Sequence, residues 1–305
     1  MLATLFQLMG TMFFLMLVGV LLRITGLIDD RAKKSLTDII LYAILPCNII
    51  KAFSSNISDC GAEDFVTILI IAIAVQVMAL FISKFLYGFI KKGKREVYQY
   101  GTVCSNSGFL GNPIAEGVFG TTGLMYAAVF LIPQRIVMWS AGVTFFSKED
   151  NRVETYKKVL THPCMVATYI GLLIMILNFK IPSFINGSIT ALSNCTTAMT
   201  MVYVGTILVD INIKKLINLQ QIYFSFIRLI VMPSVVYAIC LIAKIDPLIS
   251  GVCVLLTGMP AGSTTSLLAA KYEADEDAAA QSVVFTTILS IITIPIWSAI
   301  LLNNL

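Results

Sequence analysis

The sequence predicts an all-α integral membrane protein with about ten transmembrane helices. Of its 305 residues, 58% are hydrophobic and only 12% are charged, which is about half the charge of an average soluble domain. Its mean hydropathy is +0.89. A spanning helix needs about 20 mainly apolar residues, so roughly ten spans with short connections fill the chain and leave no room for a soluble domain.

Charge clusters and Pro/Gly turns divide the chain into the ten predicted spans. The first apolar stretch runs from Leu2 to Leu22. Because it is longer than the apolar part of a signal peptide and no basic residue precedes it, we interpret it as the first span. The predicted spans are 3–23, 33–54, 64–90, 96–119, 122–146, 159–178, 186–209, 217–243, 247–271 and 277–303.

The basic residues predict the orientation of these spans. If the N-terminus lies outside, the inward loops hold 16 of the 21 Lys and Arg residues, and the outward loops hold only Lys51, Lys180 and Lys244. Cytoplasmic loops carry the excess of basic residues in membrane proteins. We therefore expect both termini outside a cell membrane, and the net charge of +4 needs no nucleic acid to explain it.

The number of spans predicts an internal repeat. Five spans per half would place two related halves in opposite orientations, as in the inverted repeats of many secondary carriers. The predicted units are a first repeat at 1–146, a short cytoplasmic linker at 147–158 and a second repeat at 159–305.

The fourth and ninth spans, at equivalent places in the two halves, contain residues that interrupt a helix. The fourth contains Asn106-Ser-Gly-Phe-Leu-Gly-Asn-Pro113, and the ninth contains Thr257-Gly-Met-Pro-Ala-Gly-Ser-Thr-Thr265. Proline costs about 3 kcal/mol in a helix interior and glycine about 1 kcal/mol. The alternative is a pair of ordinary proline kinks, which is how we interpret Pro46, Pro133, Pro233 and Pro295.

Broken helices at membrane depth predict an anion site. Opened backbone is tolerated there only where it is buried in protein or lines a watery cavity. The N-terminus of each half-helix presents free N–H groups and the positive end of a dipole, and both favour an anion. Two facing breaks would form one binding site.

Taken together, these segments resemble the auxin efflux carrier family, which includes plant auxin carriers and bacterial dicarboxylate carriers. The resemblance covers nearly the whole chain. In the first half, Asn106 with Pro113 resembles the family's first crossover and Gln134 resembles a glutamine of the site. Arg228 with Pro233 resembles a pair in the eighth helix. The most specific part is the ordered series Met259-Pro-Ala-Gly, Ala270-Lys-Tyr-Glu-Ala-Asp, Ser282-Val-Val-Phe and Ile294-Pro295.

The resemblance implies ten helices in two inverted repeats with broken crossover helices 4 and 9, an architecture like that of bile-acid symporters. Helices 1, 2, 6 and 7 would form a scaffold, often dimeric, and the others a transport unit that moves past it as an elevator. The implied substrates are small organic anions such as malate, malonate or auxin-like carboxylates.

The short linker differs from the long central loop of plant members, and the second crossover places Met259 and Ala261 beside Pro260, which leaves the partner of Asn106 open. This departure favours a small carboxylate over the plant hormone.

The expected site combines both breaks with two residues of the fifth span. The predicted substrate-binding residues are Asn106, Ser107, Gly108, Gly111, Asn112, Pro113, Gln134, Arg135, Pro260, Ala261, Gly262, Ser263 and Thr264. Arg135 either binds a substrate carboxylate or pairs with Glu116 or with backbone carbonyls. Glu116 either takes part in proton coupling or lies at the outer surface. Proton or sodium coupling remains open.

Other polar residues within spans have structural alternatives. We interpret Arg228 as a structural residue that snorkels to the inner boundary. The polar face of the seventh span, with Asn194, Thr196, Thr197 and Thr200, either lines the path or, as we favour, packs between helices.

The sequence gives less support to other functions. The single histidine, His162, lies beside Pro163 without a hydrolase or zinc motif, so an enzyme is not expected. The seven cysteines form no CxxC pair, and no metal or cofactor is expected. A sodium-coupled organic-anion symporter of the bile-acid type is the closest alternative.

Overall fold

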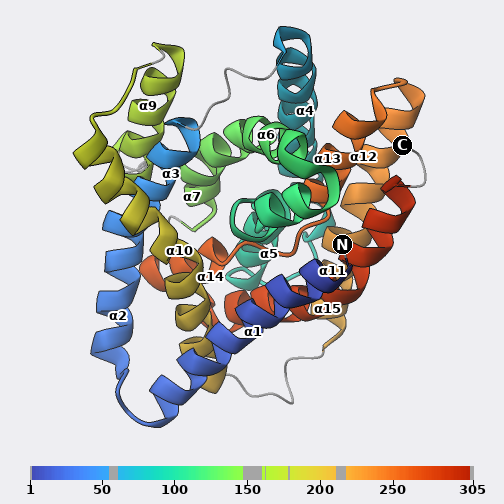
Figure 1. The fold of residues 1–305 in the computed structure, drawn as a ribbon. Helices are drawn as coiled ribbons and strands as arrows, with labels where there is room; N and C mark the ends of the chain where they lie inside the picture. The colour runs from blue at the N-terminus through green and yellow to red at the C-terminus, as the bar shows by residue number, and fades with distance from the viewer. Residues whose placement is uncertain are drawn as a thin grey trace.

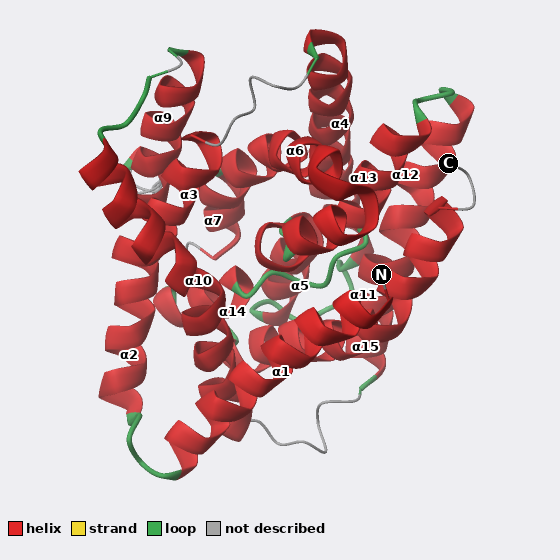
Figure 2. Cartoon of the chain, in the orientation of Figure 1, coloured by secondary structure: helices red, strands yellow, loops and turns green. Residues whose placement is uncertain are grey.

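The computed structural model describes residues 2–54, 61–146, 160–161, 163–177, 179–210 and 218–302. The predicted linker at 147–158 and His162 lie outside these described residues. Nearly all of the described chain is helical, and the described residues form no β-strand (Figure 2). Five described segments are long and apolar enough to cross a membrane: Asp30–Ser54, Glu63–Leu86, Ile114–Phe146, Leu219–Ile242 and Glu276–Leu302. The all-helical membrane class predicted from the composition is therefore confirmed.

The first half of the chain begins with a long apolar helix and continues through bent and interrupted ones (Figure 1). The side chain of Asp29 accepts the N–H of Ala32 and so caps the next helix, satisfying one of its free donors. Its helices are α1 (Leu2–Ile24), α2 (Asp30–Ile39), α3 (Leu45–Ser54), α4 (Ala62–Leu86), α5 (Lys94–Val103), α6 (Asn112–Trp139) and α7 (Ala141–Phe146). Within α6 the chain turns at Gly120, whose φ is 71°, between the predicted fourth and fifth spans.

The second half of the chain is also built of long, bent and interrupted helices. Asp246 accepts the N–H groups of Leu248 and Ile249, and Pro247 occupies the first turn of the helix that follows, where no N–H is needed. Its helices are α9 (Pro163–Ile176), α10 (Ser183–Asp210), α11 (Leu219–Phe226), α12 (Met232–Ile242), α13 (Pro247–Thr257), α14 (Thr264–Lys271) and α15 (Glu276–Leu302).

Three prolines are each preceded by a widened helical turn. The π-helical turns at 40–44, 107–111 and 227–231 end two residues before Pro46, Pro113 and Pro233. A proline ring clashes with the carbonyl four residues earlier, and a π turn is a single-turn widening found mostly at functional sites. Pro133 and Pro295, in contrast, lie inside α6 and α15.

The helices pack in two groups. One contains α1, α2, α3, α9 and α10, and the other contains α4 to α6 and α11 to α15; within each group the helices contact one another extensively. Figure 1 shows α2, α3, α9 and α10 together on the left and α4, α12, α13 and α15 on the right.

The closest helix pair in the first group is α1 with α10. A Cβ added at Gly19 would lie 2.0 Å from the carbonyl oxygen of Val202, and one added at Gly205 would lie 2.0 Å from that of Met16. Glycine at both positions therefore allows the two backbones to touch, as small residues do between membrane helices.

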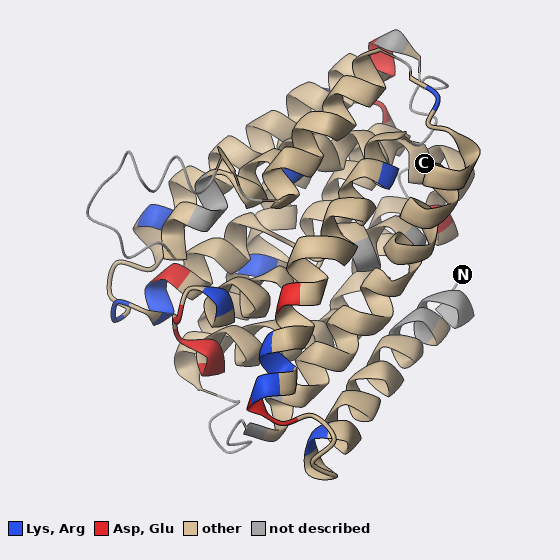
Figure 3. Cartoon of the chain, turned by 90° about the vertical axis from the view of Figure 1, so that its left-hand side faces the viewer, with Lys and Arg blue, Asp and Glu red and all other residues tan. Residues whose placement is uncertain are grey.

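Two ion pairs connect the groups at one end of the molecule. Lys33 of α2 lies 3.2 Å from Glu276 of α15, and Lys271 of α14 lies 3.0 Å from Asp38 of α2. Figure 3 shows most of the ribbon in tan, with the largest gathering of charged residues at the lower left.

Candidate functional site

Two interrupted helices meet in the interior of the molecule. Helix α5 ends at Val103 and a non-helical segment, 104–106, follows; α13 ends at Thr257 and a non-helical segment, 258–263, precedes α14. The N–H of Asn106 donates to the carbonyl of Pro260 at 2.8 Å, and the N–H of Gly262 donates to that of Cys104 at 3.0 Å. The two segments thus lie side by side as a short antiparallel bridge, where loops cross the middle of Figure 2.

Glycines and buried hydrogen bonds fix the positions of these two segments. A Cβ at Gly262 would lie 3.2 Å from the carbonyl oxygens of Cys104 and Ser105, and one at Gly111 would lie 2.6 Å from the Cδ2 atom of Leu256. The Ser107 hydroxyl donates to the carbonyl of Leu256 at 2.7 Å, and the Ala261 N–H donates to the Thr286 hydroxyl at 3.1 Å.

A small cavity of about 40 Å³ lies at this junction. Beside it, Gln134 donates to the carbonyl of Ser105 at 2.9 Å and accepts from its hydroxyl at 3.0 Å, which fixes the amide of Gln134. Seven of the residues predicted from the sequence line this cavity: Asn106, Gly108, Gln134, Arg135, Gly262, Ser263 and Thr264.

Several polar atoms at this junction have no hydrogen-bond partner among the described residues. They are both amide atoms of Asn106, one terminal nitrogen of Arg135 and the hydroxyl of Ser263. Asn106 is 2% exposed, Arg135 8% and Ser263 0%. Burying an unpaired polar group costs free energy, and nearly all buried polar groups are paired, so these atoms are the ones a bound polar ligand would satisfy.

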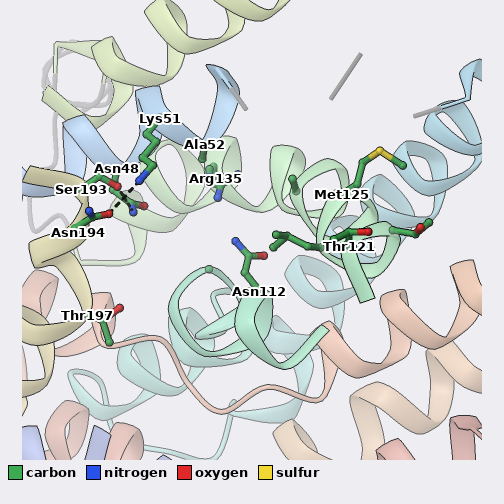
Figure 4. Close-up of a pocket in the computed structure, with 14 residues that line it drawn as sticks. Asn48, Lys51, Ala52, Asn112, Thr121, Met125, Arg135, Ser193, Asn194 and Thr197 are labelled. Atoms are coloured by element: carbon green, nitrogen blue, oxygen red, sulfur yellow. Dashed lines mark hydrogen bonds between the residues drawn. The ribbon is translucent and has the colours of Figure 1, made fainter. Parts of the chain in front are cut away.

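A second, larger cavity of about 840 Å³ adjoins the small one. Asn48, Gly108 and Arg135 line both cavities. Figure 4 shows Arg135 and Asn112 pointing toward the same space, with Lys51 and Asn194 at its edge. Beyond the shared residues, the lining residues are Lys51, Ala52, Asn112, Thr121, Thr122, Leu124, Met125, Ala128, Ser193, Asn194 and Thr197.

The remaining predicted residues support the site rather than line it. Ser107 and Ala261 are buried in the hydrogen bonds described above, the carbonyl of Pro260 accepts from Asn106, and Gly111 permits close approach to α13. Pro113 is the second residue of α6.

Sequence reasoning did not single out Asn48, Lys51 or Ser193, which are polar residues of the larger cavity. Asn48 donates to the Ser193 hydroxyl at 3.1 Å, and Lys51 donates to the Asn194 side-chain oxygen at 3.0 Å. We had placed Lys51 in an outward loop, but it lies in α3. Asn48 and Lys51 are three residues apart and so share a helix face, and this spacing was a signal that could have been used.

The residues on the polar face of the seventh span have different surroundings. Asn194 and Thr197 line the larger cavity. Thr196 and Thr200 instead donate to backbone carbonyls of their own helix, α10, at 2.6 and 2.7 Å.

The charged residues Arg228, Glu116 and Arg135 have different surroundings. The interpretation of Arg228 as a snorkelling residue is wrong: its side chain is 3% exposed and donates to the Thr102 carbonyl at 3.2 Å, so it braces the end of α5. Glu116 is exposed and forms no ion pair with Arg135 among the described contacts. Arg135 instead lies over the Phe53 ring at 5.8 Å.

The long apolar helices and the buried interruptions are features of multi-pass membrane transport proteins. Residues 4–298 match the model of a family described as membrane transport protein, and the chain belongs to that family. It is the auxin efflux carrier family that the sequence motifs resemble, a family of membrane transporters rather than of enzymes.

Two archaeal proteins are similar along almost their whole length. An uncharacterized transporter of Methanocaldococcus jannaschii is 28% identical over 301 residues, covering 95% of this chain and 96% of that protein. An uncharacterized transporter of Methanothermobacter thermautotrophicus is 24% identical over 297 residues, covering 94% and 95% respectively.

Proposed function

We propose that this transporter is a secondary carrier of small organic anions. The observation that carries the proposal is the junction of the two interrupted helices, where the unpaired atoms of Asn106, Arg135 and Ser263 surround a small cavity. An amide, a guanidinium and a hydroxyl together match the hydrogen-bonding needs of a carboxylate.

The charge of the larger cavity also supports an anion. Lys51 and Arg135 are its two charged residues, and no Asp or Glu is present among the described residues that line it. A cavity of one sign of charge with low-dielectric walls concentrates ligands of the opposite sign. A cation would gain nothing from this lining.

The transport mechanism that we propose is elevator-type alternating access in ten spans arranged as two inverted repeats, with spans 4 and 9 as crossover helices. The contacts of α10 with α1 and α3, and of α3 with α9, are more extensive than those that join this group to the other helices, which supports a scaffold past which the other helices move. The substrate site would then travel with the moving group, because Asn106, Gln134 and Ser263 all belong to it.

We further propose that the protein lies in the cell membrane with both termini outside and that the larger cavity opens outward. Lys51 lies in the last turn of α3, at the end of that helix predicted to be outside. The ion pairs Lys33–Glu276 and Lys271–Asp38 would then close the cytoplasmic side. A homodimer formed through the scaffold remains a prediction from the family resemblance.

The test is ligand binding and uptake by the purified protein. A panel of mono- and dicarboxylates is screened by thermal shift, because a ligand of the folded state raises the melting temperature by mass action. Uptake of the best ligand into proteoliposomes is then measured with and without sodium and proton gradients. We expect saturable carboxylate uptake that one of these gradients drives.

Two outcomes would redirect the proposal. Binding of a cation or neutral solute without any anion would contradict the assigned chemistry of the junction. Strict sodium dependence would favour the alternative, a sodium-coupled symporter of the bile-acid type, whereas uptake driven by a pH gradient alone would exclude it.

A further inference from the structure

Lys51 is a basic residue of the larger cavity that belongs to the opposite helix group from Arg135. It lies in the last turn of α3, whereas Arg135 lies in α6. Both side chains line the same cavity, where Figure 4 shows Lys51 and Arg135 on neighbouring helices. A ligand that contacted both would therefore connect the two groups.

The contacts of Lys51 hold its charge in place without neutralising it. Its ammonium group donates to the side-chain oxygen of Asn194 at 3.0 Å, and a lysine has three N–H donors. Asn194 is a neutral amide, and Lys51 forms no ion pair with any residue that the structure describes. The ammonium is thus oriented by α10 and still offers donors and a full positive charge to the cavity.

Arg135 offers a second, differently shaped cationic group. One of its terminal nitrogens is buried without a partner, and the guanidinium lies over the ring of Phe53. A planar guanidinium binds one carboxylate through two parallel hydrogen bonds, while an ammonium acts as a compact point charge. The cavity thus supplies two positive groups of complementary geometry.

Two cationic groups from different helices favour a ligand that carries two anionic groups. A monocarboxylate would leave one cation of the cavity without a counter-charge, whereas a dicarboxylate would satisfy both. The larger cavity, at about 840 Å³, has room for such a molecule together with its remaining water. Because a cavity of this volume accommodates monocarboxylates as well as dicarboxylates, selection between the two has to come from charge.

We propose that Lys51 is the specificity-determining residue that makes this carrier select dicarboxylates over monocarboxylates, by binding the second carboxylate while the junction beside Arg135 binds the first. This inference rests on the proposed function. The structural alternative is that Lys51 serves only to tie α3 to α10 through Asn194.

The experiment compares matched acids on matched variants. Uptake of malonate, succinate, propionate and butyrate into proteoliposomes is measured at pH 7.5, where all carboxyl groups are ionised, for the wild-type protein, Lys51→Gln and Lys51→Arg. Glutamine retains an N–H donor for Asn194 and removes the charge, on a side chain that is one atom shorter. Lys244→Gln is the control, because Lys244 is exposed at the end of α12 and lines neither cavity.

We expect the wild-type protein and the control to prefer the dicarboxylates. In Lys51→Gln the KM for malonate and succinate should rise about tenfold, while the values for propionate and butyrate and the melting temperature stay unchanged. Lys51→Arg should retain most of the preference. A rise in KM confined to dianions is not expected from a purely structural tie between α3 and α10.

Three results would overturn the proposal. One is an unchanged ratio of dicarboxylate to monocarboxylate uptake in Lys51→Gln, and another is an equal loss for both classes together with a lower melting temperature. In both cases carboxylate uptake by the wild-type protein would leave the anion-carrier function standing. If the wild-type protein neither binds nor carries any of the four acids, the proposed function fails together with the inference.

Discussion

The two helix interruptions share a backbone arrangement but differ in what they present to a ligand. In the first, the Asn106 side chain has both polar atoms unpaired. In the second, the Pro260 carbonyl and the N–H groups of Ala261 and Gly262 are all used in hydrogen bonds, and Ser263 contributes the one unpaired hydroxyl of that segment among the described atoms. On the proposed function, the first interruption would supply most of the recognition, and the second would supply Ser263 together with the frame that holds both segments.

The largest effect should follow from changing the recognition side of this comparison. Asn106→Ala removes an amide that would bind a charged carboxylate, and such hydrogen bonds contribute about 1.5–3 kcal/mol. We expect the KM for the carried anion to rise roughly ten- to a hundred-fold while the protein stays folded. Uptake kinetics and size-exclusion chromatography of the same preparation measure the two quantities. Unchanged saturable uptake would contradict the assignment.

The next largest effect should come from crowding the frame. Gly262→Ala places a methyl group 3.2 Å from the carbonyl oxygens of Cys104 and Ser105, and overpacking of this kind costs about 1–3 kcal/mol. We expect a lower melting temperature together with reduced uptake, because the two segments must separate slightly. Gly187→Ala is the matched control, since a Cβ there meets no atom within 4 Å. Equal melting temperatures for both variants would show that the frame tolerates displacement.

A smaller effect is expected from relaxing the frame. Pro260→Ala keeps the carbonyl that accepts from Asn106 and frees the backbone, which changes stability by about 0.4–1 kcal/mol where proline fits the native conformation. Uptake should fall about two- to fivefold in a folded protein. If both Asn106→Ala and Pro260→Ala carried the anion at the wild-type rate, the site would lie elsewhere.

The smallest effect is expected for Ser263→Ala, and what matters there is whether the melting temperature rises or falls. Ser263 is buried with an unpaired hydroxyl, so Ser263→Ala removes a desolvated group from the ligand-free protein. The melting temperature without ligand should stay equal or rise, while the stabilisation by a bound anion decreases. Melting temperatures measured with and without ligand separate the stability of the free protein from the stabilisation by the anion. A lower melting temperature without ligand would indicate that the hydroxyl is paired in the native protein.

Composition and helix-breaking residues were sufficient to predict the membrane class and the positions of both interruptions. The fourth span opens at Cys104, two residues before the predicted start, because α5 ends where Cys104 becomes extended. Propensities alone do not set that boundary, since Cys104 carries no turn signal. The bridge between Ser105 and Ala261 decides it, and it joins residues that are far apart in the sequence.

The cavity shows the limit of sequence reasoning more clearly. Arg135 was predicted because a charge within an apolar span is conspicuous, Asn106 because it lies at a helix break, and Gln134 from the family resemblance. Lys51 lies in the last turn of α3, where polar residues are ordinary, so nothing in its span distinguishes it from an interface residue. Asn194 lies near the middle of α10, on the polar face for which packing between helices was the favoured interpretation. Only the packing of α3 against α10 brings them to one wall. Arg228 was misjudged for a related reason, because its depth depends on the helices around it.

The contact between α1 and α10 has a consequence for how the molecule can move. Each backbone occupies the notch left by a glycine of the other, at Gly19 and Gly205, so neither helix can slide along its partner without collision. We therefore expect α1 and α10 to move together as one rigid unit. Any large rearrangement has to be accommodated at contacts made by side chains, such as the ion pairs of α2 with α14 and α15, which can break and re-form without disturbing a backbone.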